Sequence, residues 1–273
     1  TVKFMTSSLT IANYKLKSPQ SLKEHEIGPF TIGLIDGDGS LQVNHWRKKN
    51  LQFRLVVKLN DMPLNYEMLC ILSHTYGGYV RRGIDKNTQY VQWIINDQKT
   101  FHHNIIPLFD KYPPITSRMQ LQYHFFKRFL LEPNIELYFI ERSKKYDLRT
   151  SYATECLEVP LYFKEWLAGF IEAEGSFSIR QKGNNSFSIA QNHDYYLIKA
   201  IRDYYSVNHL TISSKKGKVS GFPIYEISIA SKEGLGKVID HCTPLLQGYK
   251  YYQLSEFVLN SKAFQDRVPN FFT

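Results

Sequence analysis

The sequence predicts an α+β protein made of two pseudo-symmetric halves, and three observations support this. First, the stretches TIGLIDGDGS at 31–40 and LAGFIEAEGS at 167–176 share one pattern, an apolar run that ends in two acids between small residues. Second, the last acids of these stretches, Asp38 and Glu174, lie 136 residues apart in a chain of 273. Third, the same order of elements follows each stretch. A duplicated unit explains the length and the repetition together.

Each half is expected to follow the order α-β-β-α-β-β-α. Alternating apolar and polar residues predict strands, and apolar residues at helical spacing predict helices. After the first motif we expect strands at 40–47 and 51–60, a helix at 65–76, strands at 77–84 and 89–96, and helices at 100–112 and 117–131. After the second motif we expect strands at 176–181 and 186–191, a helix at 196–205, strands at 210–216 and 224–230, and helices at 235–246 and 251–264. The expected organisation is an N-terminal extension (1–28), a first half (29–142), a linker (143–161) and a second half (162–273).

The composition fits a globular chain with a substantial core, since 43% of the residues are hydrophobic. No run of eighteen apolar residues occurs, and the first residues lack the apolar block of a secretory signal, so we expect neither a membrane span nor export. Cys70, Cys156 and Cys242 are odd in number and far apart. Neither a disulfide framework nor a zinc cluster is indicated, and a reducing compartment is expected.

The chain is basic, with 34 Lys and Arg against 25 Asp and Glu, a formal charge of +9. Such a balance favours polyanionic partners, either nucleic acid or an anionic membrane. The basic residues fall on strand-like stretches at 51–60 and 209–218, beside Gln, Asn and Ser, rather than in one helix or tail. This placement favours nucleic acid.

Small residues line one face of each motif helix. Positions four apart share a helix face, so Gly33 lies above Gly37, and Gly169 lies above Ala173. A glycine inside a helix costs about 1 kcal/mol relative to alanine, which suggests a compensating contact with another helix at close range. The two stripes are therefore expected to pack on each other.

Packing the stripes would bring the acids at the helix ends, Asp38 and Glu174, together. Two carboxylates held close repel each other unless a divalent metal ion lies between them. In the simpler interpretation Gly39 and Gly175 are helix C-caps and the acids are solvated neighbours. Acids are, however, disfavoured at helix C-termini by the helix dipole, so the metal site is the stronger hypothesis.

These residues resemble the motifs of the LAGLIDADG homing endonucleases, specifically of the single-chain kind that carries two copies. The second copy matches at Leu167, Ala168, Gly169, Ile171, Ala173 and Gly175, with Phe170 a conservative change and with Glu172 and Glu174 in place of Asp. The first copy keeps Gly33, Leu34, Ile35, Asp36, Asp38 and Gly39 and departs at Thr31, Ile32 and Gly37.

The resemblance implies that each half forms a four-stranded antiparallel sheet that sits as a saddle in the DNA major groove, with the paired helices over the minor groove. It implies Mg²⁺ as cofactor, with Mn²⁺ as a substitute and Ca²⁺ supporting binding only. The implied ligands are the carboxylates of Asp38 and Glu174 and the carbonyls of Gly37 and Ala173. The first acids of the motifs, Asp36 and Glu172, are expected to be structural rather than ligands.

The resemblance also implies a polar side chain at the end of the second strand of each half and a basic one before its last helix. By position these correspond to Gln191 and Lys250 in the second half, and to Asn60 and Arg118 in the first. Because arginine does not readily release a proton, the two half-sites need not be equivalent.

Base readout is expected from alternate strand positions, because successive side chains of a strand point to opposite faces. In the first strands, Leu41, Val43, Phe53, Leu55, Val57 and Leu59 would face the core. The predicted DNA-facing residues are Gln42, Asn44, Trp46, Gln52, Arg54, Lys58, Tyr79 and Arg81 in the first half, and Ser178, Arg180, Lys182, Ser186, Ser188, Thr211, Ser213 and Lys215 in the second. Arg reads guanine and Gln or Asn reads adenine, whereas Lys often contacts phosphate.

The resemblance implies a monomeric, organelle-encoded enzyme of mitochondrion or chloroplast that makes a double-strand break with 3′ overhangs in a long, asymmetric DNA target, as in intron homing. Two alternatives from the same fold stay open: a maturase that binds group I intron RNA, and a catalytically silent DNA-binding relative. A third, an HNH-type nuclease suggested by HHN at 102–104, lacks a second correctly spaced histidine.

Overall fold

The computed structural model describes residues 10–11, 14–152, 157–179, 185–217 and 222–273. Each half contains a four-stranded antiparallel sheet, and both sheets have the same strand order. The first sheet is ordered β3 (Gly39–Trp46), β4 (Asn50–Asn60), β6 (Thr88–Ile95) and β5 (Tyr79–Asp85). The second is ordered β7 (Ser176–Ser178), β8 (Ser186–Asn192), β10 (Pro223–Ile229) and β9 (Ser213–Lys216). The predicted α+β fold of two pseudo-symmetric halves is confirmed.

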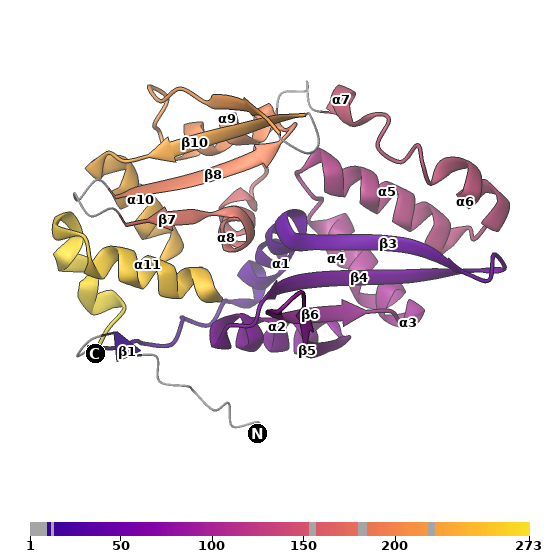
Figure 1. Ribbon diagram of the computed structural model, residues 1–273, viewed down its shortest axis with the longest axis horizontal. Helices are drawn as coiled ribbons and strands as arrows, with labels where there is room; N and C mark the ends of the chain where they lie inside the picture. The colour runs from indigo at the N-terminus through magenta and orange to yellow at the C-terminus, as the bar shows by residue number, and fades with distance from the viewer. Residues whose placement is uncertain (1–9, 12–13, 153–156, 180–184, 218–221) are drawn as a thin grey trace.

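The two motif helices, α1 (Glu24–Asp38) and α8 (Phe163–Glu174), lie between the two sheets at the centre of the molecule (Figure 1). The remaining helices of the first half are α2 (Pro63–Tyr76), α3 (Gln98–Thr100), η1 (Phe101–Ile105), α4 (Ile106–Lys111), α5 (Ser117–Leu131) and α6 (Ile135–Glu141). The second half adds α9 (Tyr195–Tyr204), α10 (Lys232–Cys242), α11 (Tyr249–Leu259) and η2 (Lys262–Asn270), and α7 (Arg149–Tyr152) lies between the halves in sequence.

The motif helices are central because they are apolar on every side. In α1, all nine residues 28–36 are buried, and in α8 all seven residues 166–172 are buried. A helix without a polar face is stable only where other elements cover it completely. Here each motif helix covers the other and is covered by its own sheet.

The first sheet follows the expected alternation. In β4, Phe53, Leu55 and Val57 are buried, whereas Gln52 and Lys58 are exposed. The β3–β4 hairpin projects from the body of the molecule (Figure 1), and its turn residues Arg47 and Lys48 have positive φ values of 51° and 57°. Trp46 pairs with Asn50, so the loop has three residues, and the left-handed backbone of two of them suits the connection between twisted strands.

Several elements differ from their predicted extents. The strand expected at 176–181 is described only at Ser176–Ser178, and β9 begins at Ser213 instead of 210. The single helix expected at 100–112 is divided by the π-helical turn η1, in which the amide of Ile106 donates to the carbonyl of Phe101. The next residue, Pro107, has no N–H to donate, which favours such a shift of the helical ladder.

Both ends of the described chain meet. The amide of Lys17 donates to the carbonyl of Phe271 at 2.7 Å, and Leu16 forms a β-bridge with Phe272. The short strands β1 (Thr10–Ile11) and β2 (Tyr14–Lys15) precede this contact. Among the residues that the structure describes, no helix is long and apolar enough to cross a membrane.

Candidate functional site

The site lies where the two motif helices touch. A methyl group added to Gly33 would overlap the backbone carbonyl of Trp166, and one added to Gly169 would overlap the carbonyl of Phe30. The backbones are therefore in direct contact at both glycines. The predicted close packing of the small-residue stripes is confirmed.

The acids at the two helix ends are brought together by this packing. A Cβ on Gly37 would overlap that of Ala173 and would lie 3.3 Å from the Glu174 side chain. The pKa of Asp38 is raised to about 7, first by loss of solvation and then by the negative charge of Glu174. The Asp38 side chain still reaches water, at the rim of a cavity. Two carboxylates thus share a site in which their joint charge is unfavourable.

Two basic groups partly offset that charge. The positive charges of Arg118 and Lys250 both act to lower the pKa of Glu174, although burial keeps it above its usual value. Burial in turn lowers the pKa of the Lys250 ammonium group, against the opposing attraction of Glu172, Asp38 and Glu174. The four side chains form one electrostatically linked group.

Arg118 and Lys250 occupy equivalent positions but differ in their contacts. Each is the second residue of its helix, α5 or α11. The Arg118 guanidinium donates to the carbonyls of Asp36, Gly37 and Gly39, at 2.5, 3.0 and 2.8 Å. It therefore caps the C-terminus of α1. It also occupies one lone pair of the Gly37 carbonyl, which was predicted to bind metal.

The first acid of each motif holds the start of the helix that carries the basic residue of its own half, α5 or α11. Asp36 is fully buried and accepts from the amides of Ile115 and Thr116, from the Thr116 hydroxyl, and from the Trp166 indole of the other half. Burial raises its pKa to about 6 in spite of these bonds. Asp36 is thus a structural residue, as expected.

Glu172 has the equivalent role in the second half. Its carboxylate accepts from the amides of Gln247 at 3.2 Å and Lys250 at 2.8 Å, at the start of α11. Burial raises its pKa, and these backbone bonds oppose the rise. The first acids thereby fix the helix turns that carry Arg118 and Lys250.

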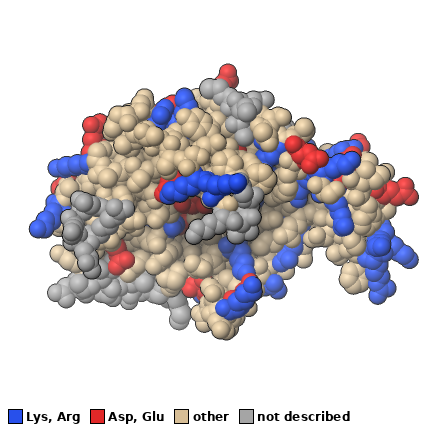
Figure 2. Space-filling view, turned by 45° about the horizontal axis from the view of Figure 1, so that its top comes forward, with Lys and Arg blue, Asp and Glu red and all other residues tan. Residues whose placement is uncertain are grey.

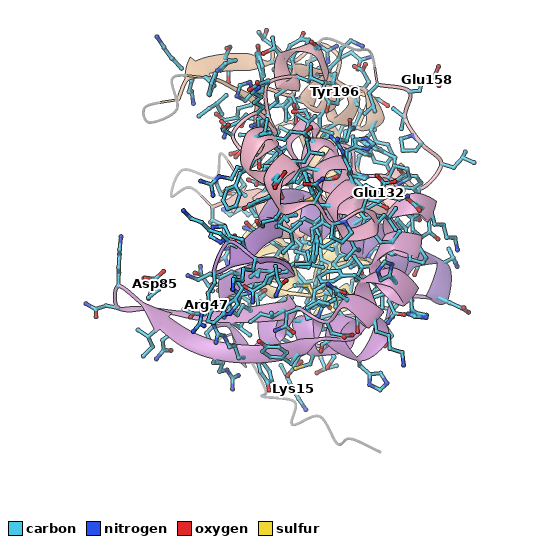
Figure 3. The ribbon with its side chains drawn as sticks, turned by 90° about the vertical axis from the view of Figure 1, so that its right-hand side faces the viewer. Lys15, Arg47, Asp85, Glu132, Glu158 and Tyr196 are labelled. Atoms are coloured by element: carbon cyan, nitrogen blue, oxygen red, sulfur yellow. The ribbon has the colours of Figure 1, made fainter. Side chains whose placement is uncertain are left out.

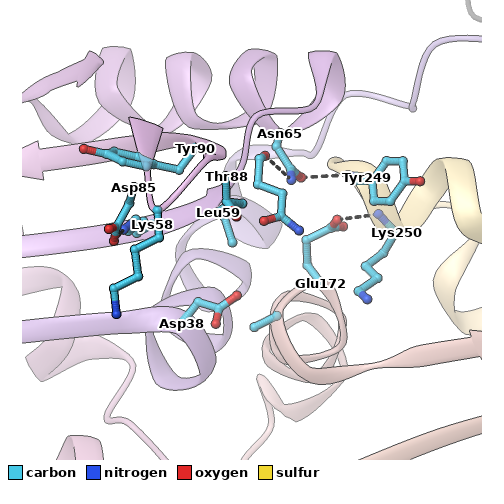
Figure 4. Close-up of a pocket in the computed structure, with 13 residues that line it drawn as sticks. Asp38, Lys58, Leu59, Asn65, Asp85, Thr88, Tyr90, Glu172, Tyr249 and Lys250 are labelled. Atoms are coloured by element: carbon cyan, nitrogen blue, oxygen red, sulfur yellow. Dashed lines mark hydrogen bonds and ion pairs between the residues drawn. The ribbon is translucent and has the colours of Figure 1, made fainter. Parts of the chain in front are cut away.

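A cavity of about 490 Å³ opens beside Asp38; we call it the central cavity (Figure 4). It is lined by Asp38, Lys58, Leu59, Asn60, Asn65, Asp85, Lys86, Thr88, Tyr90, Glu172, Ala173, Tyr249 and Lys250. Four residues predicted at the active site line this one cavity: Asp38, Asn60, Ala173 and Lys250. Gln191 does not line it.

The pairing register corrects the predicted equivalence of Asn60 and Gln191. Ser40 pairs with Val56 in the first sheet, and the corresponding Ser176 pairs with Ser188 in the second. Counting from these pairs, Leu59 corresponds to Gln191, and Asn60 corresponds to Asn192. Gln191 is 8% exposed and lies on the face of β8 that it shares with buried Ile189. The predicted equivalence missed this register because the two hairpins differ in length: Ser40 and its partner Val56 are further apart in sequence than Ser176 and its partner Ser188.

The predicted DNA-facing residues of the first half form rows across one sheet face. The register pairs Gln42 with Arg54, Asn44 with Gln52, and Lys58 with Gln92, which also pairs with Arg81. Tyr79 and Trp46 are 45% and 54% exposed. Gln92, which was not predicted, lies in this row between Lys58 and Arg81, but it is only 5% exposed.

The second half presents a less complete row. Ser178 pairs with Ser186, and Ser213 with Glu226, whose carboxylate binds Lys215 at 2.9 Å. Ser188 is partly exposed, whereas Ser186 is only 5% exposed and is not open to a ligand in this structure. Thr211 is exposed but precedes β9. The predicted contacts Arg180 and Lys182 lie outside the described residues.

Basic side chains are distributed over the face seen in Figure 2, and acidic ones lie near its centre and along its edges. In Figure 3, Arg47 of the β3–β4 turn and Asp85 of β5 lie on the same side of the molecule. Among the residues that the structure describes, no three or more His, Cys, Asp or Glu side chains gather in a way that could hold a metal ion.

Comparison with known proteins gives a consistent result. The family model described as LAGLIDADG endonuclease matches residues 31–130 and 167–259. The probable intron-encoded endonuclease aI3 of Dictyostelium citrinum is 36% identical over 255 residues, which cover 93% of this chain and 98% of that protein. Its namesake from Debaryomyces hansenii is 35% identical over 86% of this chain, but the match covers only 38% of that protein.

Solved structures show the same fold. The homing endonuclease I-GzeII in complex with its DNA target has a TM-score of 0.64 at 18% identity, over 88% of this chain and 91% of that one. The structure of I-SmaMI bound to uncleaved DNA in the presence of calcium ions has a TM-score of 0.61, also at 18% identity, over 91% and 97% of the two chains.

Proposed function

Since the chain belongs to the LAGLIDADG endonuclease family, we propose that it is a site-specific DNA endonuclease that makes a double-strand break in a long, asymmetric target. The observation that carries this proposal is the meeting of Asp38 and Glu174 at the coincident ends of α1 and α8, where burial and mutual repulsion raise the pKa of Asp38. A silent binding protein would have no need to hold two acids in this way.

The acid pair fits a divalent cation. Asp38 and Glu174 would hold it, together with the carbonyl of Ala173 and the remaining lone pair of the Gly37 carbonyl, and water and DNA phosphate would complete the shell. We propose Mg²⁺, with Mn²⁺ as a substitute and Ca²⁺ supporting binding without efficient cutting. The ion supplies Lewis-acid stabilisation of the phosphate and a more acidic water.

The surrounding side chains have distinct proposed roles. Lys250 reaches the central cavity with a depressed pKa, so it can both neutralise the phosphate and exchange a proton. Arg118 is bound to three carbonyls of the motif and can only stabilise charge. We assign the ordering of water to Asn60, which lines the central cavity, and in the second half to Gln191, which lies outside that cavity at the β8 position that corresponds to Leu59. The two half-sites are therefore chemically unequal.

The two sheets read the DNA. We assign base readout and phosphate contacts to the polar faces of β3, β4 and β5 (Gln42, Asn44, Trp46, Gln52, Arg54, Lys58, Tyr79 and Arg81) and to the corresponding face of the second half, including Ser178, Ser188, Ser213 and Lys215. Because one chain supplies both halves, 29–142 and 162–273, a monomer suffices. The different side chains of the halves imply an asymmetric target.

Cleavage across the minor groove with 3′ overhangs, and a role in the homing of an organellar intron, complete the proposal. The intron-encoded relatives support this role, and one similar protein is named an uncharacterized mitochondrial protein of Saccharomyces cerevisiae, 25% identical over 64% of this chain.

Selection of cleaved sites from a random DNA library tests the function. With Mg²⁺ present, we expect one long, non-palindromic sequence to be enriched and both of its strands to be cut. If no sequence is enriched among cleaved molecules while DNA is still bound, the protein is a binding protein and the proposal fails.

A further inference from the structure

Two helices each carry one basic side chain to the active site. At the start of each of these helices, a backbone amide is hydrogen-bonded by a side chain from the opposite half. These helices are α5, which carries Arg118, and α11, which carries Lys250. The first amides of a helix lack partners within it, so an acceptor that binds them fixes the position of the turn. In this molecule two such acceptors, Asn65 and Asp194, bind helix amides of the half to which they do not belong.

Asn65 of the first half holds α11 of the second (Figure 4). Its Oδ1 accepts from the amide of Tyr249 at 2.8 Å, and its Nδ2 donates to the carbonyl of Asn60 at 3.0 Å. The Asn65 amide thus joins the end of β4 to the residue that precedes Lys250. It is 6% exposed, so water competes little for these bonds.

The approach of Asn65 depends on the glycine at the N-cap of α11. A Cβ on Gly248 would lie 2.7 Å from Asn65 Oδ1 and 2.6 Å from Glu172 Oε1. The N-cap residue itself provides no side-chain bond to the helix. The first turn of α11 is therefore fixed by two side chains that do not belong to this helix, Asn65 of the first half and Glu172 of the second.

Asp194 of the second half holds α5 of the first in the same way. Its fully buried carboxylate accepts from the amide of Ser117 at 3.0 Å and from the Ser117 hydroxyl at 2.5 Å. That hydroxyl in turn accepts from Nε of Arg149 at 3.0 Å. Ser117 directly precedes Arg118, as Tyr249 precedes Lys250.

The position of Asp194 is unusual for an aspartate. It is the N-cap residue of α9, where an Asp normally binds the amides of its own helix, yet its side chain makes no such bond. Its capping capacity is used on α5 instead. Asn65 likewise stands in the first turn of α2, whose N-cap also makes no side-chain bond.

We infer that Asn65 and Asp194 are positioning residues, each of which places the basic side chain of the opposite half at the active site. This inference rests on the proposed function, in which Lys250 and Arg118 act on the scissile phosphates. The pseudo-twofold axis that relates the halves also relates the antiparallel strands of a duplex, so each basic side chain serves one strand. A residue of one half therefore controls cleavage by the group that the other half supplies.

Strand-resolved cleavage of a target duplex with a different dye on each strand tests this. Lys250→Ala and Arg118→Ala are expected to slow opposite strands. Asn65→Ala should slow the strand that Lys250→Ala slows, and Asp194→Ala the strand that Arg118→Ala slows, each by about 10-fold or more relative to the other strand. The Kd for the target, measured with Ca²⁺, should stay at the parental value.

Two further variants separate positioning from general stability. Asn65→Asp keeps an acceptor for the Tyr249 amide but loses the donor to the Asn60 carbonyl, so it should recover part of the parental balance of the strands that Asn65→Ala loses. Asn134→Ala removes a comparable N-cap bond to the amide of Leu137 in α6, remote from the site, and should lower thermal stability without any strand bias.

The possible results separate a failure of the positioning role of Asn65 and Asp194 from a failure of the proposed roles of Lys250 and Arg118. If Lys250→Ala and Arg118→Ala are strand-specific but Asn65→Ala slows both strands equally, or slows the same strand as Asp194→Ala, the inference is wrong and the proposed function stands. If neither basic-residue variant changes either rate, the proposed roles of Lys250 and Arg118 fail as well.

Discussion

Asp38 is a carboxyl group held where its charged form is disfavoured. Its pKa of about 7 results first from desolvation and second from Glu174, and Lys250 and Arg118 offset only part of this. In the unfolded chain an aspartate has a pKa near 4, so at intermediate pH the folded protein binds a proton that the unfolded chain does not. The stability from this proton is complete below about pH 4 and is lost as the pH rises through 7.

Asp38→Asn should therefore stabilise the metal-free protein at pH 8 but change little at pH 5. Because Asp38 is solvent-exposed at the cavity rim, we expect a modest gain, about 1 kcal/mol. Thermal unfolding in the presence of a chelator at the two pH values measures it. Asp110→Asn is the control, with the opposite expected effect. Burial acts to raise the pKa of Asp110, but hydrogen bonds from Lys127 and Tyr123 outweigh it and lower the pKa. This variant should therefore lose stability at pH 8.

Asp36 should respond differently from Asp38, although only two residues separate them. Its oxygens accept from four donors in the buried junction, and an amide would direct its own N–H groups at some of those donors. Asp36→Asn is expected to lower the free energy of unfolding by about 2 to 3 kcal/mol. Chemical denaturation would show this, and an unchanged midpoint would contradict the capping role.

At this scale the sequence was informative where the motif itself carries the chemistry. The pairing of Asp38 with Glu174 followed from the glycine stripes, because close helix packing forces the helix ends together. Asn65 and Asp194 were not predictable, since each binds a segment of the other half that is distant in sequence. Their position depends on how the halves dock, which periodicity does not encode.

The central element is the α1–α8 pair. Gly33→Ala would place a methyl group on the backbone carbonyl of Trp166, so the helices must separate. We expect a loss of about 3 kcal/mol, which outweighs the better helix propensity of alanine.

Gly236 in α10 provides the matched control. A methyl group there would meet only the Arg267 side chain at an ordinary 3.5 Å, so Gly236→Ala should stabilise the protein by about 0.5 to 1 kcal/mol. Thermal melts of both variants decide the question. Equal small effects would show that Gly33 is not at a tight interface.

The order of the strands was predictable from the sequence, but their first and last residues were less so. The alternation of β4 identifies Phe53, Leu55 and Val57 as core residues, because one face of the sheet is buried. The π-helical turn η1 was missed, since residues 101–105 have an apolar spacing that a regular helix also satisfies. The difference depends on Pro107, whose missing N–H shifts the hydrogen bonds.

The whole molecule carries a formal charge of +9, which should dominate its affinity for DNA. Binding to a duplex releases counterions, so log K should fall linearly with log salt, by about 0.9 per phosphate contact. Substituting Lys215 by Ala should reduce that slope by about one contact, whereas Gln42→Ala should leave the slope unchanged and relax the preference at one base pair. Titrations at several salt concentrations, on the target and on scrambled DNA, measure both.

The central claim is that one acid from each half forms a single metal-dependent active site. The Asp38→Asn/Glu174→Gln double variant keeps the shape of both side chains and removes both charges, so binding of the target should survive or strengthen while cleavage in Mg²⁺ is lost. We propose to measure single-turnover cleavage and Kd on the same preparation. Cleavage at the parental rate would contradict the account, and loss of cleavage with retained binding is the result that it predicts.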